Sequence, residues 1–255
     1  MTMFHALILG IVEGLTEFLP VSSTGHLILA GHLLGLPATA FLKSFDITIQ
    51  LGAILAVVAL YAKRLLVDRA LLERVIVAFI PTGLIGFFVY PFVKQVLLSS
   101  TNVVAWSLLV GGIIIILFER SYIPKEKGGT DLSILSYSQA ALIGLFQSLS
   151  IIPGVSRAAA TMIGGMTLGI SRKSIVEFSF LLAIPTMLAA TGYDLLKNAS
   201  SFSSDQFSLL AVGFVTSFIV ALVAIRFLIR FIQTHTFAPF GIYRIVVAVL
   251  FWMMR

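Results

Sequence analysis

Two glutamates, Glu13 and Glu17, lie four positions apart in an otherwise apolar segment near the start of this 255-residue chain. A spacing of four places both carboxylates on one face of a helix. An ionisable side chain inside an apolar segment is costly, and two like charges one turn apart repel each other. We therefore expect the pair to hold a divalent cation, share a proton or face a water-filled cavity. The alternative is that both side chains reach the water interface.

The residues after the glutamates could complete such a site. Pro20 interrupts the apolar segment, and Ser22 and Ser23 are good N-cap residues for a helix that starts after the break. His26 would lie one turn into that helix, on the side of the two serines. Because carboxylates and hydroxyls are its neighbours, we interpret His26 as a catalytic candidate. The other histidines have no such group of carboxylates and hydroxyls nearby in the sequence and are interpreted as structural or interfacial: His5, His32 and His235.

A second apolar segment is broken at IIPGVSR, residues 151–157. Its proline and glycine predict a turn, with Ser156 as the N-cap and Arg157 as the first residue of the returning helix. The planar fork of an arginine suits phosphate oxygens, and a helix N-terminus adds N–H donors and partial positive charge. Thr161 would share the Arg157 face. This predicts an anion site. The alternative is a salt bridge from Arg157 to a glutamate, and both interpretations place the two breaks in contact.

The composition indicates that these groups lie in a membrane. Hydrophobic residues make up 59% and charged residues 11% of the chain, against about 45–50% and 25% in soluble domains. A span of about 30 Å needs roughly 20 apolar residues. The zero cysteine count excludes disulfides and thiolate chemistry. Six segments qualify as spans: about 46–62, 75–91, 102–118, 177–196, 207–225 and 237–254.

The basic residues predict the orientation of these spans. Most of the 17 Lys and Arg residues fall in four stretches, and such residues collect on cytoplasmic loops, which explains the net charge of +6 without a nucleic-acid partner. The broken segment 137–170 then enters and leaves on the cytoplasmic face, and 3–36 does so on the outer face. Both are predicted to be re-entrant hairpins. The four basic stretches are 63–74, 119–136, 171–174 and 226–236.

The expected fold class is an all-α polytopic membrane protein with six transmembrane helices and two re-entrant helical hairpins. A unit of one hairpin and three spans occurs twice, and the two copies have opposite orientations. The chain is therefore expected to be an inverted-topology repeat within one integral membrane domain. Repeat 1 covers about 1–118 and repeat 2 about 137–255. Residues 134 positions apart match, as Gly10 with Gly144 and Ser22 with Ser156. Such repeats place their site near the midplane, where the repeats meet.

Three glycine pairs with small-xxx-small spacing fall in the broken segments. This spacing lets helix backbones approach closely, so we expect tight packing at each pair. The pairs are Gly10/Gly14, Gly31/Gly35 and Gly165/Gly169.

The assembled groups predict phosphoryl transfer. Helix N-termini, hydroxyls and an arginine bind phosphate, while Glu13 and Glu17 are candidate ligands for Mg²⁺ or Ca²⁺, hard cations that often bridge to substrate phosphates. The surrounding lipid indicates that the phosphate belongs to a lipid. A secondary transporter or polyprenyl-phosphate flippase would use the same inverted repeat. A membrane scaffold without turnover is a third interpretation, against which the cost of buried charged groups argues.

The stretches EGLTEFLPVSSTGH at 13–26 and PGVSRAAAT at 153–161 closely resemble the two signature motifs of bacterial undecaprenyl-diphosphate phosphatases, and the likeness covers essentially the whole chain. The resemblance implies hydrolysis of undecaprenyl diphosphate to undecaprenyl phosphate and phosphate, which recycles the carrier lipid for cell-wall synthesis and confers bacitracin resistance. It also implies Mg²⁺ or Ca²⁺ and a site open to the periplasmic or outer face of the bacterial inner membrane.

The resemblance also assigns roles to residues. Where the family usually has Ser-Gly after the arginine, this chain has Ala158-Ala159, so a hydroxyl there is not essential in this protein. The nucleophile is left open between water and Ser23, with His26 or a glutamate as base. The expected partners are the polyprenyl diphosphate and membrane lipids, and a homodimer is left open. The expected catalytic residues are Glu13, Glu17, Ser23 and His26. The expected phosphate-binding residues are Ser22, Ser156, Arg157 and Thr161.

Overall fold

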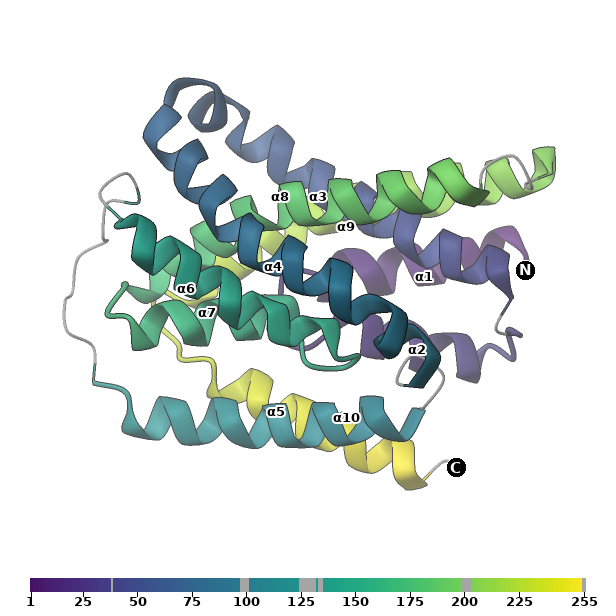
Figure 1. Ribbon diagram of the computed structural model, residues 1–255. Coiled ribbons are helices and arrows are strands. Elements are labelled where there is room, and N and C mark those ends of the chain that lie inside the picture. The colour runs from purple at the N-terminus through teal and green to yellow at the C-terminus, as the bar shows by residue number, and fades with distance from the viewer. Residues whose placement is uncertain (38, 97–100, 124–131, 133–134, 199–202, 254–255) are drawn as a thin grey trace.

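The chain folds as a bundle of helices in the computed structural model shown in Figure 1, which describes residues 1–37, 39–96, 101–123, 132, 135–198 and 203–253. Within these residues every regular element is helical, and five helices are long and apolar enough to cross a membrane. The prediction of an all-α polytopic membrane protein is confirmed. The five are α3 (Ala40–Val67), α4 (Arg69–Val96), α5 (Thr101–Ser121), α8 (Arg172–Asn198) and α9 (Ser204–Phe231).

The sixth predicted span corresponds to α10 (Ala238–Met253), an apolar helix of 16 residues. At a rise of about 1.5 Å per residue it covers roughly 24 Å, which is less than the hydrocarbon thickness of about 30 Å. It packs closely on α5, since a Cβ added at Gly112 would lie 2.6 Å from the Gly241 carbonyl oxygen. The helix therefore lies where the sequence predicts a span but is shorter than the others.

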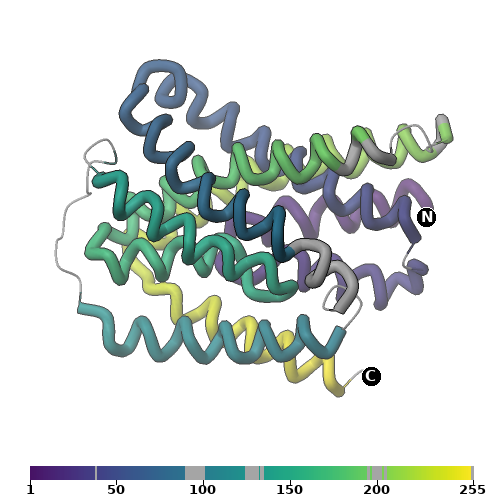
Figure 2. The backbone as a smooth tube through the Cα atoms, viewed as in Figure 1, coloured from purple at the N-terminus to yellow at the C-terminus, as the bar shows by residue number. Residues whose placement is uncertain are grey.

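Both broken segments form a helix, a break and a second helix, as predicted. The first contains α1 (Met3–Thr16) and α2 (Ser23–Leu33). The second contains α6 (Tyr137–Ser148), a short 3₁₀ turn η2 (Leu149–Ile151) and α7 (Arg157–Thr167). Figure 1 shows that the two hairpins approach the middle of the molecule from opposite ends. Figure 2 shows the N-terminus and the far end of α10 at the same end.

The two hairpins are alike in local detail at an offset of 134 residues. Thr2 and Ser136 cap their first helices with the same reciprocal side-chain and backbone hydrogen bonds. The second helices begin after Ser22 and Ser156, whose φ values of 74° and 68° are unusual for residues other than glycine. This correspondence supports the repeat. The repeat boundaries and the orientation relative to a bilayer stay predictions, and most of the predicted basic loop 119–136 lies outside the described residues.

The first helix of each hairpin packs against the other half of the chain, α1 along α9 and α6 along α4. Glycine permits the first contact, because a Cβ at Gly10 or Gly14 would lie 2.7 Å from a carbonyl oxygen of α9. The expected tight packing is wrong for two other glycines. Among the described residues nothing lies within 4 Å of a Cβ added at Gly35 or Gly169. Both end their helices with positive φ values, 64° and 86°, a C-terminal capping role that favours glycine.

The two remaining glycines of the Gly31/Gly35 and Gly165/Gly169 pairs differ in their surroundings. Gly31 has only one side-chain atom near an added Cβ, at 4.0 Å, so the expectation of close backbone packing is wrong there as well. A Cβ at Gly165 would collide with the side chain of Ile175 on α8, so this glycine does allow close packing of α7 on α8.

The largest cluster of buried apolar side chains among the described residues includes Phe18 and Val21 of the first break and Ala158 just after the second. Phe18, which directly follows Glu17, is fully buried and packs edge-on against Phe180 of α8 with ring centroids 5.2 Å apart. Aromatic pairs favour this edge-to-face geometry. The first break is therefore anchored in the core immediately beside its charged residue.

Candidate active site

A small polar cavity of about 90 Å³ lies where the two breaks meet. A water molecule occupies about 30 Å³ of liquid volume, so the cavity has the scale of a few waters or one compact polar group. Its lining comes from both breaks, from α3 and from α8. The lining residues are Glu17, Ser22, Ser23, Thr24, Gln50, Ser150, Gly154, Ser156, Arg157 and Met187.

Two helices begin at this cavity, and both are capped as predicted. The hydroxyl of Ser22 accepts a hydrogen bond from the backbone N–H of Gly25, and that of Ser156 accepts one from Ala159. The other N–H groups of a first helical turn have no acceptor within the helix, and the helix end carries partial positive charge. The N-termini of α2 and α7 therefore give the cavity two sources of positive potential.

Glu17, Ser23 and Arg157 are bonded to one another across the two hairpins. Arg157 Nη2 lies 3.0 Å from Glu17 Oε1, and the Ser23 hydroxyl donates to Glu17 Oε2 at 2.5 Å. Arg157 also donates to the carbonyl oxygen of Ser179 at 2.9 Å. Glu17 and Arg157 are 6% and 7% exposed. The predicted contact between the two breaks is confirmed, in the form of the salt bridge given above as an alternative.

This ion pair is better explained by function than by stability. Taking two charges out of water costs several kcal/mol each, so a buried pair contributes little net stability compared with apolar packing. The pair also leaves donor capacity unused, because Arg157 Nε is buried without a hydrogen-bond partner among the described residues. An oxyanion in the cavity could use this donor together with the forked guanidinium.

Glu13 lies one turn before Glu17 on α1 and is fully buried. Neither of its carboxylate oxygens has a hydrogen-bond partner among the described residues. The equivalent residue of the second hairpin, Gln147, donates from its amide to the hydroxyls of Thr82 and Thr186 at 3.0 and 3.1 Å. The amide nitrogen of Gln147 is thus bonded, whereas its oxygen, like both oxygens of Glu13, has no hydrogen-bond partner among the described residues. A buried carboxylate without partners requires a proton or a cation.

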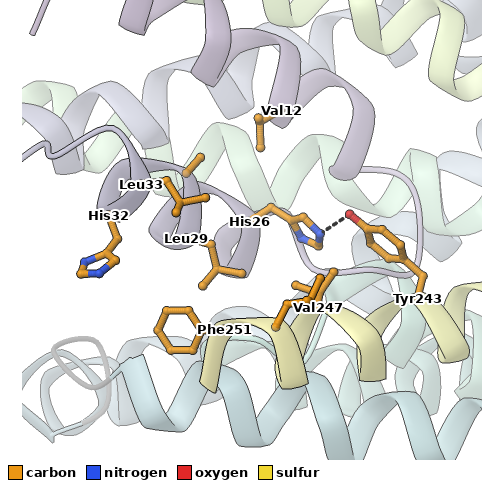
Figure 3. A pocket seen from close by; sticks show the side chains of 10 residues that line it. Val12, His26, Leu29, His32, Leu33, Tyr243, Val247 and Phe251 are labelled. Atoms are coloured by element: carbon orange, nitrogen blue, oxygen red, sulfur yellow. Dashed lines mark hydrogen bonds between the residues drawn. The ribbon is translucent and has the colours of Figure 1, made fainter. Parts of the chain in front are cut away.

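His26 lies beside a different cavity, an apolar groove of about 280 Å³ between α2 and α10 that Figure 3 shows. Its Nδ1 is 2.7 Å from the carbonyl oxygen of Ser22, and its Nε2 is 2.8 Å from the hydroxyl of Tyr243, whose ring stacks on the imidazole. Both ring nitrogens are therefore occupied, and the ring does not line the polar cavity. The catalytic role of His26 stays a prediction.

Thr161 is fully buried, and its hydroxyl donates to the carbonyl oxygen of Arg157 at 2.7 Å. This is a bond within α7, and Thr161 does not line the polar cavity. Of the other histidines, His5 completes the N-cap of α1, His32 lines the apolar groove and His235 stacks on Phe231, and their structural or interfacial role stays a prediction. Direct contact between Thr161 and a phosphate stays a prediction.

Several lining and supporting residues were not predicted. Gln50 and Ser150 line the polar cavity, and their only signal is a polar side chain inside an apolar run. Asp46 of α3 has a buried carboxylate oxygen without a partner among the described residues. Arg244 of α10 is fully buried; an arginine inside a predicted span is a signal, but it does not identify the partners.

Together the fold and the site define an all-α polytopic membrane protein whose buried polar centre joins two broken helices. Comparison with known sequences is more specific. The chain belongs to the family described as "Bacitracin resistance protein BacA", whose model matches residues 6–250.

Three relatives show how completely the chain is covered. A protein from Aquifex aeolicus is 51% identical over 98% of this chain and 98% of its own length, and one from Thermus thermophilus is 49% identical over 97% and 95%. A third, from Methanococcus aeolicus, is 44% identical over 99% and 98%. All three are named undecaprenyl-diphosphatase.

Proposed function

We propose that this chain hydrolyses undecaprenyl diphosphate to undecaprenyl phosphate and inorganic phosphate, and so recycles the carrier lipid for cell-wall synthesis and confers bacitracin resistance. The observation that carries the proposal is the meeting of Glu17, Ser23 and Arg157 at two helix N-termini inside an apolar bundle. Full-length relatives named undecaprenyl-diphosphatase support it. Nothing in these names favours the flippase or transporter alternative.

The terminal phosphate would bind between the N-termini of α2 and α7. Arg157 would turn part of its guanidinium from Glu17 to the phosphate oxygens, which suit its planar fork. Ser22 and Ser156 cap the helices whose free N–H groups would face the anion. Thr161 would support Arg157 through its bond to the Arg157 carbonyl oxygen. This divides phosphate binding between groups that contact the anion and groups that hold them.

The Ser23 hydroxyl is the best-placed nucleophile. It already donates to Glu17, and this carboxylate could take the proton as Ser23 Oγ attacks the terminal phosphorus. The bond from that phosphorus to the bridging oxygen would break, and undecaprenyl phosphate would leave. Water would then hydrolyse the phosphoserine and release inorganic phosphate. In the alternative route, Glu17 activates a water that attacks directly. Both routes need in-line attack and neutralisation of the charge on the leaving oxygen.

A divalent cation, Mg²⁺ or Ca²⁺, fits the donors that are present. Among the described residues no three acidic, histidine or cysteine side chains form a ready metal cage. Mg²⁺ is, however, commonly held by one or two carboxylates together with substrate phosphates. Glu13, whose oxygens lack partners, and Glu17 would supply these carboxylates. When bound, the cation would neutralise negative charge on the diphosphate.

The lipid chain and the membrane orientation complete the proposal. The apolar groove beside His26 would accept part of the prenyl chain, since ten residues line it and the only polar ones are His26, His32 and Tyr243 (Figure 3). By the positive-inside rule, the first hairpin, and with it the opening of the site, would lie on the periplasmic face of the bacterial inner membrane. The homodimer remains a prediction.

Purified protein in detergent tests the function without a membrane gradient. We expect it to release phosphate from undecaprenyl diphosphate in equal amount to undecaprenyl phosphate. A transporter or flippase without hydrolytic activity would release none, because transport does not break the diphosphate bond. Folded protein with no phosphate release in the presence of Mg²⁺ and Ca²⁺ would refute the proposal.

A further inference from the structure

Arg244 of α10 is a fully buried cation without an acidic partner among the described residues. Its guanidinium instead makes five hydrogen bonds, all to backbone carbonyl oxygens. A guanidinium has five N–H donors, so its hydrogen-bonding capacity is used in full. The acceptors, with donor–acceptor distances of 2.8–3.3 Å, are the carbonyl oxygens of Pro20, Ser107, Leu108, Gly154 and Val155.

These carbonyl groups come from the two places that form the phosphatase site. Pro20 lies in the first break, two residues before the N-cap Ser22. Gly154 and Val155 lie in the second break, directly before the N-cap Ser156. The remaining two acceptors belong to α5. One side chain therefore joins both breaks and fixes them to a long apolar helix.

The two N-caps that follow these carbonyl groups need such a restraint. Both serines hold a positive φ, a conformation that non-glycine residues keep only where the surroundings impose it. The backbone direction set there determines where α2 and α7 begin. It therefore determines where Ser23 and Arg157, the first residues of those helices, meet Glu17.

The Arg244 guanidinium occupies space that is open because residue 111 is a glycine. A Cβ added at Gly111 of α5 would collide with the Arg244 guanidinium. Across the same contact, a Cβ added at Gly241 would lie 2.8 Å from the Gly112 carbonyl oxygen, so α5 and α10 touch backbone to backbone. The close approach lets an arginine on α10 reach past α5 to the breaks.

We propose that Arg244 is a positioning residue for the phosphatase site: its guanidinium holds the two breaks in register so that Ser23 and Arg157 converge on Glu17. The expected effect of Arg244 on phosphate release rests on the proposed function. The expected effect of Arg244 on the positions of the two breaks does not. Arg244 does not line the polar cavity, and its donors are already used, so it acts through the carbonyl groups and not on the phosphate.

The test uses Arg244→Lys, which keeps the charge but offers three donors on one nitrogen and cannot span three segments. We expect kcat for phosphate release to fall about 10²-fold, the effect of a misplacement near 1 Å in a catalytic site. Arg226→Lys is the matched control on an exposed arginine of α9 and should retain wild-type kcat. Wild-type kcat in Arg244→Lys would overturn the proposal.

A distance measurement separates positioning from direct contact with substrate. The chain has no cysteine, so Pro37→Cys, an exposed position just beyond the end of α2 and outside the apolar groove, and Thr167→Cys, at the exposed far end of α7, can carry the only two spin labels. Each helix is 11 residues long, which places the labels roughly 30 Å apart by helical rise alone. We expect Arg244→Lys to broaden or shift the distance distribution. Lost activity with an unchanged distribution would refute positioning.

Gly111→Ala provides a second route if Arg244→Lys does not fold. Alanine favours a helix over glycine, so harm from this change must come from the pressure of the new methyl group on the guanidinium. We expect Gly111→Ala to lower kcat and alter the label distance, while Gly86→Ala, where no atom of the described residues lies within 4 Å of the added Cβ, does neither. Gly111→Ala with wild-type kcat and distance would overturn the proposal. If wild-type protein released no phosphate, the proposed function would fail, and the distances alone would still decide whether Arg244 orders the breaks.

Discussion

Removal of either partner of the Glu17–Arg157 ion pair should destabilise the protein more than removal of both. The two charged atoms lie 3.0 Å apart, and the side chains are 4% and 6% exposed. Glu17→Gln leaves a buried arginine, and Arg157→Gln leaves a buried carboxylate that has lost its cation and keeps the hydrogen bond from Ser23. An uncompensated buried charge of this kind costs about 3–5 kcal/mol. In the double variant both charges are gone and two amides can bond to each other, so most of that cost should be recovered.

The assay is the free energy of unfolding in mixed micelles for the wild type, the two single variants and the double variant, which together give the coupling energy. A control cycle on Arg64 and Glu177 has a similar distance of 2.8 Å, but these side chains are 36% and 15% exposed. Solvent screening should reduce that coupling to about 1 kcal/mol or less. The double variant at 17 and 157 should regain stability without regaining activity. Equal couplings in the two cycles, or single variants as stable as wild type, would refute the assignment of a buried functional pair.

Three further predictions address the chemistry and the packing. Ser23→Ala should lower kcat on the order of 10³-fold or more if Ser23 is the nucleophile; a phosphate-release rate close to wild type would leave water as the attacker. Removal of divalent cations with a chelator should abolish activity, added Mg²⁺ or Ca²⁺ should restore it, and Glu13→Gln should weaken the apparent metal affinity measured by titration; metal-independent turnover would exclude the cation. Gly14→Ala should destabilise the protein by about 1–3 kcal/mol, because its new Cβ would lie 2.7 Å from Ser217 O and Val220 Cβ. Gly86→Ala, which has open space, serves as its unfolding control, and equal stability of the two variants would contradict the close α1–α9 contact.

Much of the fold follows from local sequence signals. Apolar runs longer than a bilayer span predict the long helices, and Pro20 and the Pro153-Gly154 pair predict the breaks. Ser22 and Ser156 were identifiable as N-caps because a side-chain oxygen at that position satisfies a first-turn N–H group. The meeting of the hairpins followed from charge, since a buried arginine needs an anion and the glutamates lie in the other break. The structure confirms that inference through the Arg157–Glu17 bond.

The features that could not be predicted depend on the direction in which a side chain points and on hydrogen bonds to backbone carbonyl groups. In a chain that is apolar on most faces, the pattern does not specify which side of α2 turns to the cavity, and His26 points to the apolar groove. Spacing alone placed Thr161 on the Arg157 face, but its hydroxyl bonds within its own helix. Gly35 and Gly169 fit a packing motif by spacing, yet they end helices. The five acceptors of Arg244 are carbonyl oxygens, which every residue has and which therefore leave no sequence signal.

The central claim is that lipid diphosphate is hydrolysed where the two breaks meet. Its most direct test is the rate at which folded Arg157→Gln protein forms undecaprenyl phosphate and inorganic phosphate, beside wild type and Arg120→Gln, a change on an exposed arginine at the end of α5. Loss of a donor to transition-state charge costs about 10²–10³-fold in kcat. We predict at least that loss for Arg157→Gln and none for Arg120→Gln. Wild-type rates from folded Arg157→Gln protein would contradict the account.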